Sequence, residues 1–254
     1  MQVANAVGLV TGGAGGLGGA VARMLVDGGG KVAIIDVPSS AGEQFAAELG
    51  DNAIFLPTDV TDTDQVEAAV AKTVARFGRI DLCLNAAGIS PAARVVSRDG
   101  ELFPLDLFKK TIDINLVGTF DVVRRAAGAM ANNEPGEAGE RGLIVNVTSI
   151  SAFEGQVGQA AYTASKGAIA ALTLQLARDL AKLGIRVMAI APGIMDTPML
   201  AGVDDKRRQM MADIHVFPKR LGQPEDFSQL VRSVMENGML NGEVIRMDAA
   251  TRLG

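Results

Sequence analysis

Short apolar runs alternate with longer segments of helical periodicity along the whole chain, and this alternation constrains the fold more than any other feature. The runs are apolar throughout rather than at every second residue, so both faces of each expected strand must be covered. Such a pattern predicts an α/β fold: a doubly wound parallel sheet of about seven strands with helices on both faces. The expected strands are 6–11, 31–36, 53–60, 79–88, 142–149, 185–193 and 242–248, and the expected helices are 17–28, 41–49, 63–77, 106–131, 159–183 and 225–237.

The chain is predicted to form one domain, residues 1–254, because 48% of its residues are apolar and no linker or repeat interrupts it. After the sixth expected strand comes a polar segment, residues 194–222, that carries several methionines. Methionine fits irregular apolar shapes, so the segment is expected to be a lid over a substrate. Its basic residues would then meet the phosphates of coenzyme A. The alternative is a solvated basic surface beside core methionines. The basic residues are Lys206, Arg207, Arg208, Lys219 and Arg220.

Composition argues against several kinds of partner. The net charge is −5 without a long basic block, so nucleic acid is not expected. No run of 18 uncharged apolar residues and no signal peptide is found, so no membrane association is expected. The single cysteine, Cys83, lies in an apolar run, excludes an internal disulfide and fits a reducing compartment, which predicts a cytoplasmic protein. No metal site is predicted, and the only histidine, His215, has no expected catalytic role.

A glycine-rich stretch, "TGGAGGLG" at 11–18, follows the first expected strand and opens the first helix. It fits G-x-G-x-x-G at 13–18 and also T-G-x-x-x-G-x-G at 11–18. In either spacing, glycine lets the backbone turn tightly and approach a pyrophosphate at the helix N-terminus. The position between strand and helix indicates a dinucleotide-binding Rossmann fold. The expected contacts in this loop are Gly12, Gly16, Leu17 and Gly18.

Asp36 ends the second expected strand, where a carboxylate accepts hydrogen bonds from the adenosine ribose hydroxyls. At ~5 Å and an effective dielectric constant near 20, it would repel a 2′-phosphate by ~3 kcal/mol per unit charge. NAD is therefore predicted rather than NADP. The alternative role for Asp36 is that of a turn residue at the end of a strand.

Two further segments end neighbouring strands, where ligands bind in open α/β sheets. In "TDV", Asp59 is expected to accept from the adenine amino group and the Val60 amide to donate to the ring. In "NAAG", the small residues let the backbone lie against the cofactor ribose, with Asn85, Ala87 and Gly88 as the expected contacts. Each segment taken alone also fits ordinary turn chemistry.

The only tyrosine, Tyr162, lies four residues before Lys166 in the helix expected at 159–183, so the two share one face. A free phenol has a pKa of about 10 and is a poor base at neutral pH. The nearby ammonium group is expected to lower that pKa into the range of general acid–base catalysis. Ser149 ends the fifth expected strand and would reach the same substrate oxygen. Asn115 would hold a water that links Lys166 to solvent.

These features together resemble the short-chain dehydrogenase/reductase family. The resemblance covers essentially the whole chain and rests on T-G-x-x-x-G-x-G at 11–18, N-A-A-G at 85–88, Asn115, Ser149, Y-x-x-x-K at 162–166 and "APGIMDTP" at 191–198. Departures from the family pattern are Gly15, where a serine or another polar residue is common, and Ala249–Ala250, where many relatives have a glycine.

The resemblance implies reversible oxidation of a secondary alcohol to a ketone by NAD. Tyr162 would remove the hydroxyl proton, and Lys166 would bind the nicotinamide ribose and lower the tyrosine pKa. Ser149 would hold the substrate oxygen, and Asn115 would support a proton relay. Thr197 would position the nicotinamide carboxamide. Pro192 and Gly193 complete the expected cofactor contacts.

A closer likeness, to family members that act on 3-hydroxyacyl-CoA, is carried by "NEPGEAGERG", "AFEGQVGQAAYTASKG", "ARDLAKLGIRVMAIAPG" and "LNGEVIRMD". It implies interconversion of 3-hydroxyacyl-CoA and 3-oxoacyl-CoA, with Ser149, Gln159 and Tyr162 contacting the substrate, and a homotetramer. The alternatives are a 3-oxoacyl-carrier-protein reductase, a hydroxysteroid dehydrogenase, and a non-catalytic NAD-binding sensor or scaffold.

Overall fold

The structure, a computed structural model, describes residues 1–253, in which seven strands form one sheet. The strands lie in the order β3-β2-β1-β4-β5-β6-β7, and every neighbouring pair is parallel. The expected doubly wound parallel sheet is therefore confirmed. The strands are β1 (Val7–Thr11), β2 (Lys31–Asp36), β3 (Ala53–Pro57), β4 (Leu82–Asn85), β5 (Gly142–Val147), β6 (Ile185–Pro192) and β7 (Val244–Met247).

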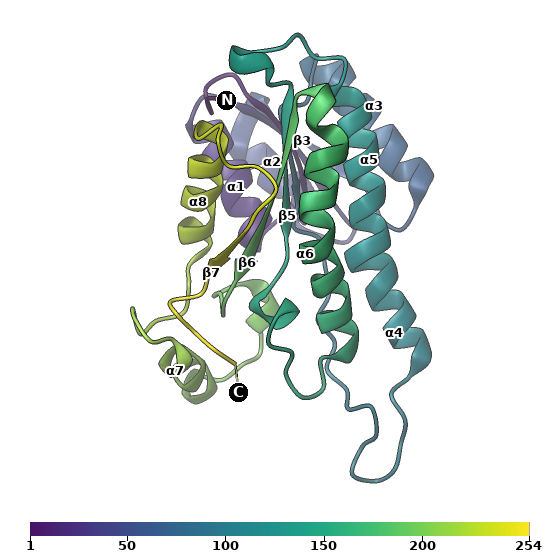
Figure 1. Ribbon diagram of the computed structural model, residues 1–254, viewed down its shortest axis with the longest axis vertical. Helices are drawn as coiled ribbons and strands as arrows, with labels where there is room; N and C mark the ends of the chain where they lie inside the picture. The colour runs from purple at the N-terminus through teal and green to yellow at the C-terminus, as the bar shows by residue number, and fades with distance from the viewer. Residues whose placement is uncertain (254) are drawn as a thin grey trace.

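Helices cover both faces of the sheet (Figure 1). One face is covered by α1, α2 and α8, and the other by α3, α5 and α6. Each layer buries its own apolar core against the strands, which explains why the strands are apolar throughout. The helices are α1 (Gly16–Asp27), α2 (Gly42–Leu49), α3 (Thr63–Phe77), α4 (Leu105–Ile112), α5 (Thr119–Met130), α6 (Ala160–Leu180), α7 (Asp205–Ile214) and α8 (Pro224–Glu236).

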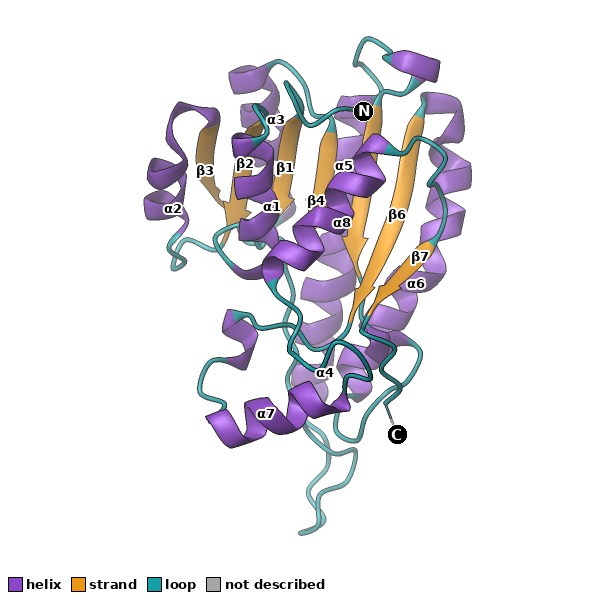
Figure 2. Ribbon diagram, turned by 90° about the vertical axis from the view of Figure 1, so that its left-hand side faces the viewer, coloured by secondary structure: helices purple, strands orange, loops and turns teal. Residues whose placement is uncertain are grey.

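The order in which the chain adds strands reverses between β1 and β4: β2 and β3 lie on one side of β1, and β4 and the later strands lie on the other. All strands point toward the same edge, where α7 and the C-terminal residues also lie (Figure 2). In open α/β sheets, a ligand binds at this carboxyl edge beside such a switch point. The segments expected to hold the cofactor therefore meet there.

The helix expected at 106–131 contains an unexpected irregular stretch. Between α4 and α5 the backbone forms a π-helix over Asp113–Gly118, with Asn115 buried inside it. A π-helical turn inside an α-helix is rare and often occurs at a functional site. The helical pattern of apolar residues continues through this stretch, so the irregularity could not be predicted from the sequence.

The segment 194–222 is more ordered than expected. It contains a short 3₁₀ turn, Pro198–Leu200, and the helix α7, neither of which was predicted. The helix begins after Asp204, whose carboxylate accepts a hydrogen bond from the Arg207 backbone N–H at 2.9 Å. No helix within residues 1–253 is both long enough and apolar enough to span a bilayer.

Candidate active site

The glycine-rich loop leaves the space that a dinucleotide requires. Gly12 has φ +61°, and a Cβ there would lie 2.8 Å from the Ala87 backbone nitrogen. A Cβ at Gly18 would lie 2.3 Å from the Gly12 oxygen. These close approaches require glycine and bring the loop against the N-A-A-G segment. Thr11 strengthens the contact, because its Oγ1 accepts hydrogen bonds from the Ala86 and Ala87 N–H groups, each at 3.2 Å.

The first turn of α1 is suited to an anion. Gly15 precedes the helix and offers no side chain to cap its N–H groups. The helix is 12 residues long, so its N-terminal dipole and free donors would favour a phosphate. The Leu17 side chain packs on the core between α1 and α8, which leaves its backbone amide as the group facing an anion. Gly16 lies beside Thr197, because a Cβ added at Gly16 would be 3.6 Å from the threonine Cβ.

Asp36 is half-buried and ends β2 as expected. Its Oδ2 accepts from the Ala14 N–H at 3.1 Å, and its Oδ1 accepts from the Val37 N–H at 2.8 Å. The carboxylate is therefore fixed at the rim of the glycine loop. These bonds show that Asp36 shapes the turn after β2, and its contact with the ribose of a dinucleotide stays a prediction.

Asp59 and Val60 follow β3 rather than belonging to it. Asp59 is exposed, and its Oδ1 accepts from the Thr61 N–H and hydroxyl at 2.9 and 2.7 Å. Val60 is buried and packs against Gly118 in the π-helix. The two residues reach the expected edge, and their contacts with adenine stay a prediction.

Pro192, Gly193 and Asn85 also lie at the ends of strands. Pro192 ends β6, and the following Gly193 N–H donates to the Met247 carbonyl oxygen at 2.9 Å. Asn85 ends β4 and is buried, with its Nδ2 donating to Asn146 Oδ1 at 2.9 Å. Asn85 therefore links β4 to β5 just below the carboxyl edge of the sheet.

Ser149 and Tyr162 face one another across the carboxyl edge. The predicted strand 142–149 ends at Val147, so Ser149 lies two residues beyond β5. Ser149 lies close enough to the Tyr162 phenol to favour its ionised form. Ser149 Oγ also accepts from the Ser151 N–H at 3.1 Å, which fixes the serine rotamer. A substrate oxygen near these two hydroxyls would meet both.

Lys166 shares a face of α6 with Tyr162, as the spacing predicted. Its Nζ lies 5.8 Å from the centre of the tyrosine ring and donates to the Val147 carbonyl oxygen at 2.7 Å. Gly88 lies beside the lysine, because a Cβ added at Gly88 would be 3.6 Å from Nζ. The structure thus brings together the serine, the tyrosine, the lysine and the N-A-A-G segment.

The expected lowering of the tyrosine pKa is wrong for the protein by itself. Burial raises the pKa of Tyr162, and the nearby Ser149 hydroxyl offsets only part of this rise. Burial also lowers the pKa of Lys166 to about 8. The physical reason is that the lysine points to a backbone carbonyl rather than to the phenol oxygen, while both groups lose solvent.

Asn115 is held by the protein through its whole side chain. Its Oδ1 accepts from the Ile89 N–H at 2.8 Å, and its Nδ2 donates to the Ile89 carbonyl oxygen at 2.9 Å and to Ser165 Oγ at 3.1 Å. Thr119 Oγ1 donates to the Asn115 carbonyl oxygen. The amide therefore fixes the segment after Gly88 against α6, and its role in a proton relay stays a prediction.

Gln159 lies directly before α6, one turn ahead of Tyr162. Its Oε1 accepts from Ser151 Oγ at 3.0 Å. Sequence reasoning did not single out Ser151 or Ser165, although each orients a predicted site residue. Their only signal is a small hydroxyl side chain close in sequence to a motif.

Three of the basic residues expected to meet coenzyme A already have acidic partners. Arg208 pairs with Asp196 and Arg220 pairs with Asp226, each over 2.6 Å, and Arg207 pairs with Asp204 over 3.5 Å. Lys206 and Lys219 are exposed. Cys83 lies fully buried in β4, as expected, and burial raises its pKa to about 12. Within residues 1–253, no cluster of three or more His, Cys, Asp or Glu residues is arranged to hold a metal ion.

Known proteins are similar to this chain over nearly all of its length. The model of the short chain dehydrogenase family matches residues 6–208. The human 3-hydroxyacyl-CoA dehydrogenase type-2 is 48% identical, over 99% of this chain and 97% of that protein. The Drosophila melanogaster protein of the same name is also 48% identical, over 99% of both.

A solved structure shares the fold as well. The crystal structure of 3-hydroxyacyl-CoA dehydrogenase type-2 from Mycobacterium avium superposes with a TM-score of 0.94, at 43% identity, and covers 98% of this chain and 97% of its own. With such relatives and a family model that spans most of its length, this chain belongs to the short-chain dehydrogenase family and is an oxidoreductase that uses NAD(H).

Proposed function

We propose that the protein interconverts a 3-hydroxyacyl-CoA and the corresponding 3-oxoacyl-CoA, with NAD(H) as its cofactor. The observation that carries this proposal is that Ser149 and Tyr162 lie close together beside the buried Lys166, whose Nζ is 5.8 Å from the centre of the tyrosine ring. The choice of substrate rests on the relatives named 3-hydroxyacyl-CoA dehydrogenase type-2. Carrier-protein thioesters and hydroxysteroids are the alternative substrates that a turnover panel separates.

In this reaction the alcohol loses a proton from its hydroxyl oxygen and a hydride from the carbon that bears the hydroxyl group. Tyr162 takes the proton at its phenol oxygen, and Ser149 holds the substrate oxygen beside it. Lys166 places a positive charge beneath the tyrosine and reaches toward the ribose through its position next to Gly88. When bound, the oxidised nicotinamide supplies the hydride acceptor and a further positive charge, which favours phenolate.

The fit of a dinucleotide follows from three features of the chain. The glycine loop approaches the N-A-A-G segment so closely that a Cβ has no room. The first turn of α1 has no side-chain cap. Asp36 presents its carboxylate beside that loop. A carboxylate at this place binds ribose hydroxyls and repels a 2′-phosphate, which supports NAD over NADP.

The segment 194–222 is the proposed lid of a single catalytic domain. Its first turn lies against the glycine loop through Thr197 and Pro198. Its outer surface carries exposed apolar side chains, among them Met199, Met210 and Phe217. Such side chains would cover an acyl chain when the lid closes.

A homotetramer in the cytoplasm completes the proposal. Val117, Phe120 and Leu174 are about half exposed on the π-helix, α5 and α6, which supports association through these helices. Light scattering on the purified protein tests the tetramer, and a monomer would reject it. Cell fractionation tests the compartment, and recovery in an organelle or membrane fraction would reject the cytoplasm.

The function is tested by following NADH absorbance with acetoacetyl-CoA as the substrate. Wild-type protein is expected to oxidise NADH, and Tyr162→Phe is expected to lose at least ~10²-fold in turnover. The same variant should keep its affinity for NAD within a few-fold, because the ring and its packing remain. Absence of turnover by wild-type protein would reject the substrate, and an unchanged rate in the variant would remove the tyrosine from the reaction.

A further inference from the structure

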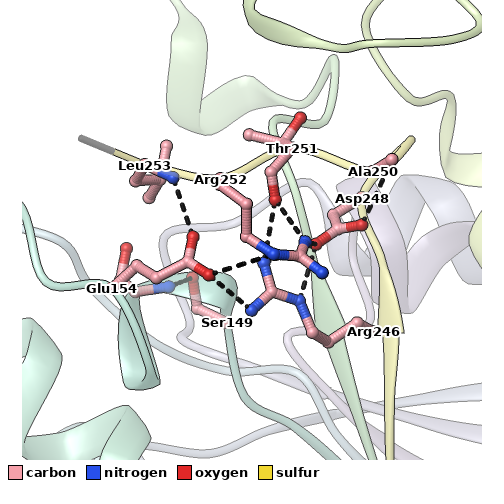
Figure 3. Close-up of polar contacts among 9 residues, drawn as sticks. Ser149, Glu154, Arg246, Asp248, Ala250, Thr251, Arg252 and Leu253 are labelled. Atoms are coloured by element: carbon pink, nitrogen blue, oxygen red, sulfur yellow. Dashed lines mark hydrogen bonds and ion pairs between the residues drawn. The ribbon is translucent and has the colours of Figure 1, made fainter.

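The last described residues turn back across the carboxyl edge of the sheet, beside the loop that follows Ser149 (Figure 3). Residues 248–253 are called the C-terminal segment here. Arg246, at the end of β7, anchors this segment by pairing with Asp248 Oδ2 at 2.7 Å and by donating to the Thr251 carbonyl oxygen at 2.9 Å. The same guanidinium group pairs with Glu154 Oε1 at 2.8 Å.

Glu154 ties the C-terminal segment to the catalytic serine. It lies five residues after Ser149, at the end of a short 3₁₀ turn that starts at Ile150. Its Oε2 accepts from the Leu253 N–H at 2.7 Å, and its Oε1 pairs with Arg252 at 3.6 Å as well as with Arg246. The Glu154 carboxylate therefore contacts Arg246, Arg252 and Leu253, and holds these residues against the loop that follows Ser149.

The other side of the C-terminal segment contacts the lid. The Val216 N–H donates to the Ala249 carbonyl oxygen at 3.0 Å. Directly before the lid, Gly193 lies so close to Asp248 that a Cβ would be 2.9 Å from the aspartate Cα. His215 is buried beside the same glycine, because a Cβ at Gly193 would lie 3.4 Å from its Nε2. The C-terminal segment therefore contacts the lid at Val216 and the residue that precedes the lid.

The backbone of the segment is held in an uncommon conformation. Ala249 has φ 49° and Ala250 has φ 62°, both in the left-handed region that alanine rarely adopts. Such a conformation persists only where surrounding contacts impose it, and it tends to occur near functional sites. Here the contacts come from Asp248, whose Oδ1 accepts from the Ala250 N–H at 3.1 Å, and from the pairs with Arg246 and Glu154.

We infer that Glu154 is a positioning residue, which acts through the C-terminal segment to set the distance between the lid and Ser149. Glu154 would not touch the reacting atoms. It would fix the shape of the site in which the substrate is held, and so act mainly on substrate binding. The kinetic test of this inference, KM for the substrate, rests on the proposed function. The structural test, hydrogen exchange in the lid, rests only on the contacts described above.

The kinetic test compares Glu154→Ala with Glu236→Ala. Glu236 ends α8, is exposed and pairs with Arg232 of the same helix, so it serves as the matched control. In Glu154→Ala, KM for acetoacetyl-CoA should rise about fivefold or more, while kcat and KM for NADH change less than about twofold. A lower melting temperature with an unchanged KM would mean a merely structural role and would overturn the inference.

A second comparison asks whether Glu154 acts through the C-terminal segment. Removal of residues 251–254 should raise KM by a similar factor, and adding Glu154→Ala to that deletion should raise it no further. Glu154→Gln should lie between the alanine variant and wild type, since an amide oxygen still accepts from the Leu253 N–H. Independent, multiplying effects of deletion and substitution would contradict the inference.

Hydrogen exchange separates failure of this inference from failure of the proposed substrate. In Glu154→Ala without substrate, amides of residues 205–217 should exchange about tenfold faster than in Glu236→Ala, the Val216 amide above all. Equal exchange in the two variants would overturn the inference whatever the enzyme turns over. Faster exchange with no turnover by wild-type protein would reject the substrate and leave the coupling of Glu154 to the lid intact.

Discussion

Lys166 donates from Nζ to the carbonyl oxygen of Val147, the last residue of β5, over 2.7 Å. This bond joins α6 to the strand that ends two residues before Ser149. The helix that carries Tyr162 is thereby held in register with the serine. The lysine thus positions the catalytic pair mechanically as well as carrying charge.

Because Lys166 is buried, stability should depend on pH in a definite direction. Burial lowers the pKa of Lys166 to about 8 in the folded protein, from the value of 10.5 that an ordinary lysine has and that we take for the unfolded chain. Between these values the unfolded chain binds the proton and the folded protein does not, so the free energy of unfolding rises with pH. Relative to Lys166→Met, wild type should gain about 2 kcal/mol between about pH 7.5 and about pH 9.5 in urea unfolding. A constant difference between the two proteins would contradict this.

Tyr162 can be titrated directly, because the chain has no other tyrosine and no tryptophan. Burial raises its pKa, so the near-ultraviolet absorbance of tyrosinate should appear only above about pH 10 in the protein alone. Saturating NAD⁺ should lower the midpoint by about 1–2 pH units through its positive charge. The urea-unfolded chain, which should titrate near pH ~10, is the reference. A midpoint that NAD⁺ leaves unmoved would refute electrostatic activation by the cofactor.

Asp36 should decide between the two nicotinamide cofactors. Asp36→Asn removes the negative charge at the rim of the glycine loop and keeps the shape of the side chain. The ratio of kcat/KM for NADP to that for NAD should rise about 10-fold or more, in line with the lost repulsion. Asp59→Asn serves as the control, since Asp59 lies beyond the next strand and is engaged with Thr61. It should leave the ratio within about twofold, and an equal response of both variants would argue against the assignment.

Two glycines of one loop should respond oppositely to substitution. Gly15 has an extended backbone and no heavy atom within 4 Å of the position of a Cβ. Gly15→Ser should therefore add an N-terminal cap to α1 and stabilise the protein by about 0.5–1 kcal/mol. Gly12→Ala should destabilise it by more than about 2 kcal/mol, since φ is +61° and the methyl group would meet Ala87. Urea unfolding measures both, and equal effects would contradict the geometry.

The sheet could be predicted because its strands are continuous apolar runs and its loops carry residue types tied to one kind of chemistry. The helix α3 was predicted at its observed bounds, Thr63–Phe77, since Asp62 caps its start and Gly78 ends it. The helix α7 was missed, because its apolar residues are confined to its second half and its N-terminal cap, Asp204, sits among other acidic and basic residues.

The residues of the site could be predicted as a set, but their orientations could not. The spacing of Tyr162 and Lys166 fixes a shared helix face and does not say that Nζ turns toward Val147. For that reason the direction of the tyrosine pKa shift was wrong. The contacts of Glu154 were invisible in the sequence, since Arg246 and Leu253 lie 92 and 99 residues away along the chain.

The widened turn at Asp113–Gly118 has a consequence for how this chain tolerates change. A π-helical turn shifts the rotational phase of everything that follows it, so α4 and α5 present faces that one regular helix could not present together. Deleting a single residue there would restore a more favourable helix and would swing the amide of Asn115 off Ile89 and Ser165. The π-helical turn is less stable than an α-helical one, but it keeps the amide of Asn115 directed at Ile89 and Ser165.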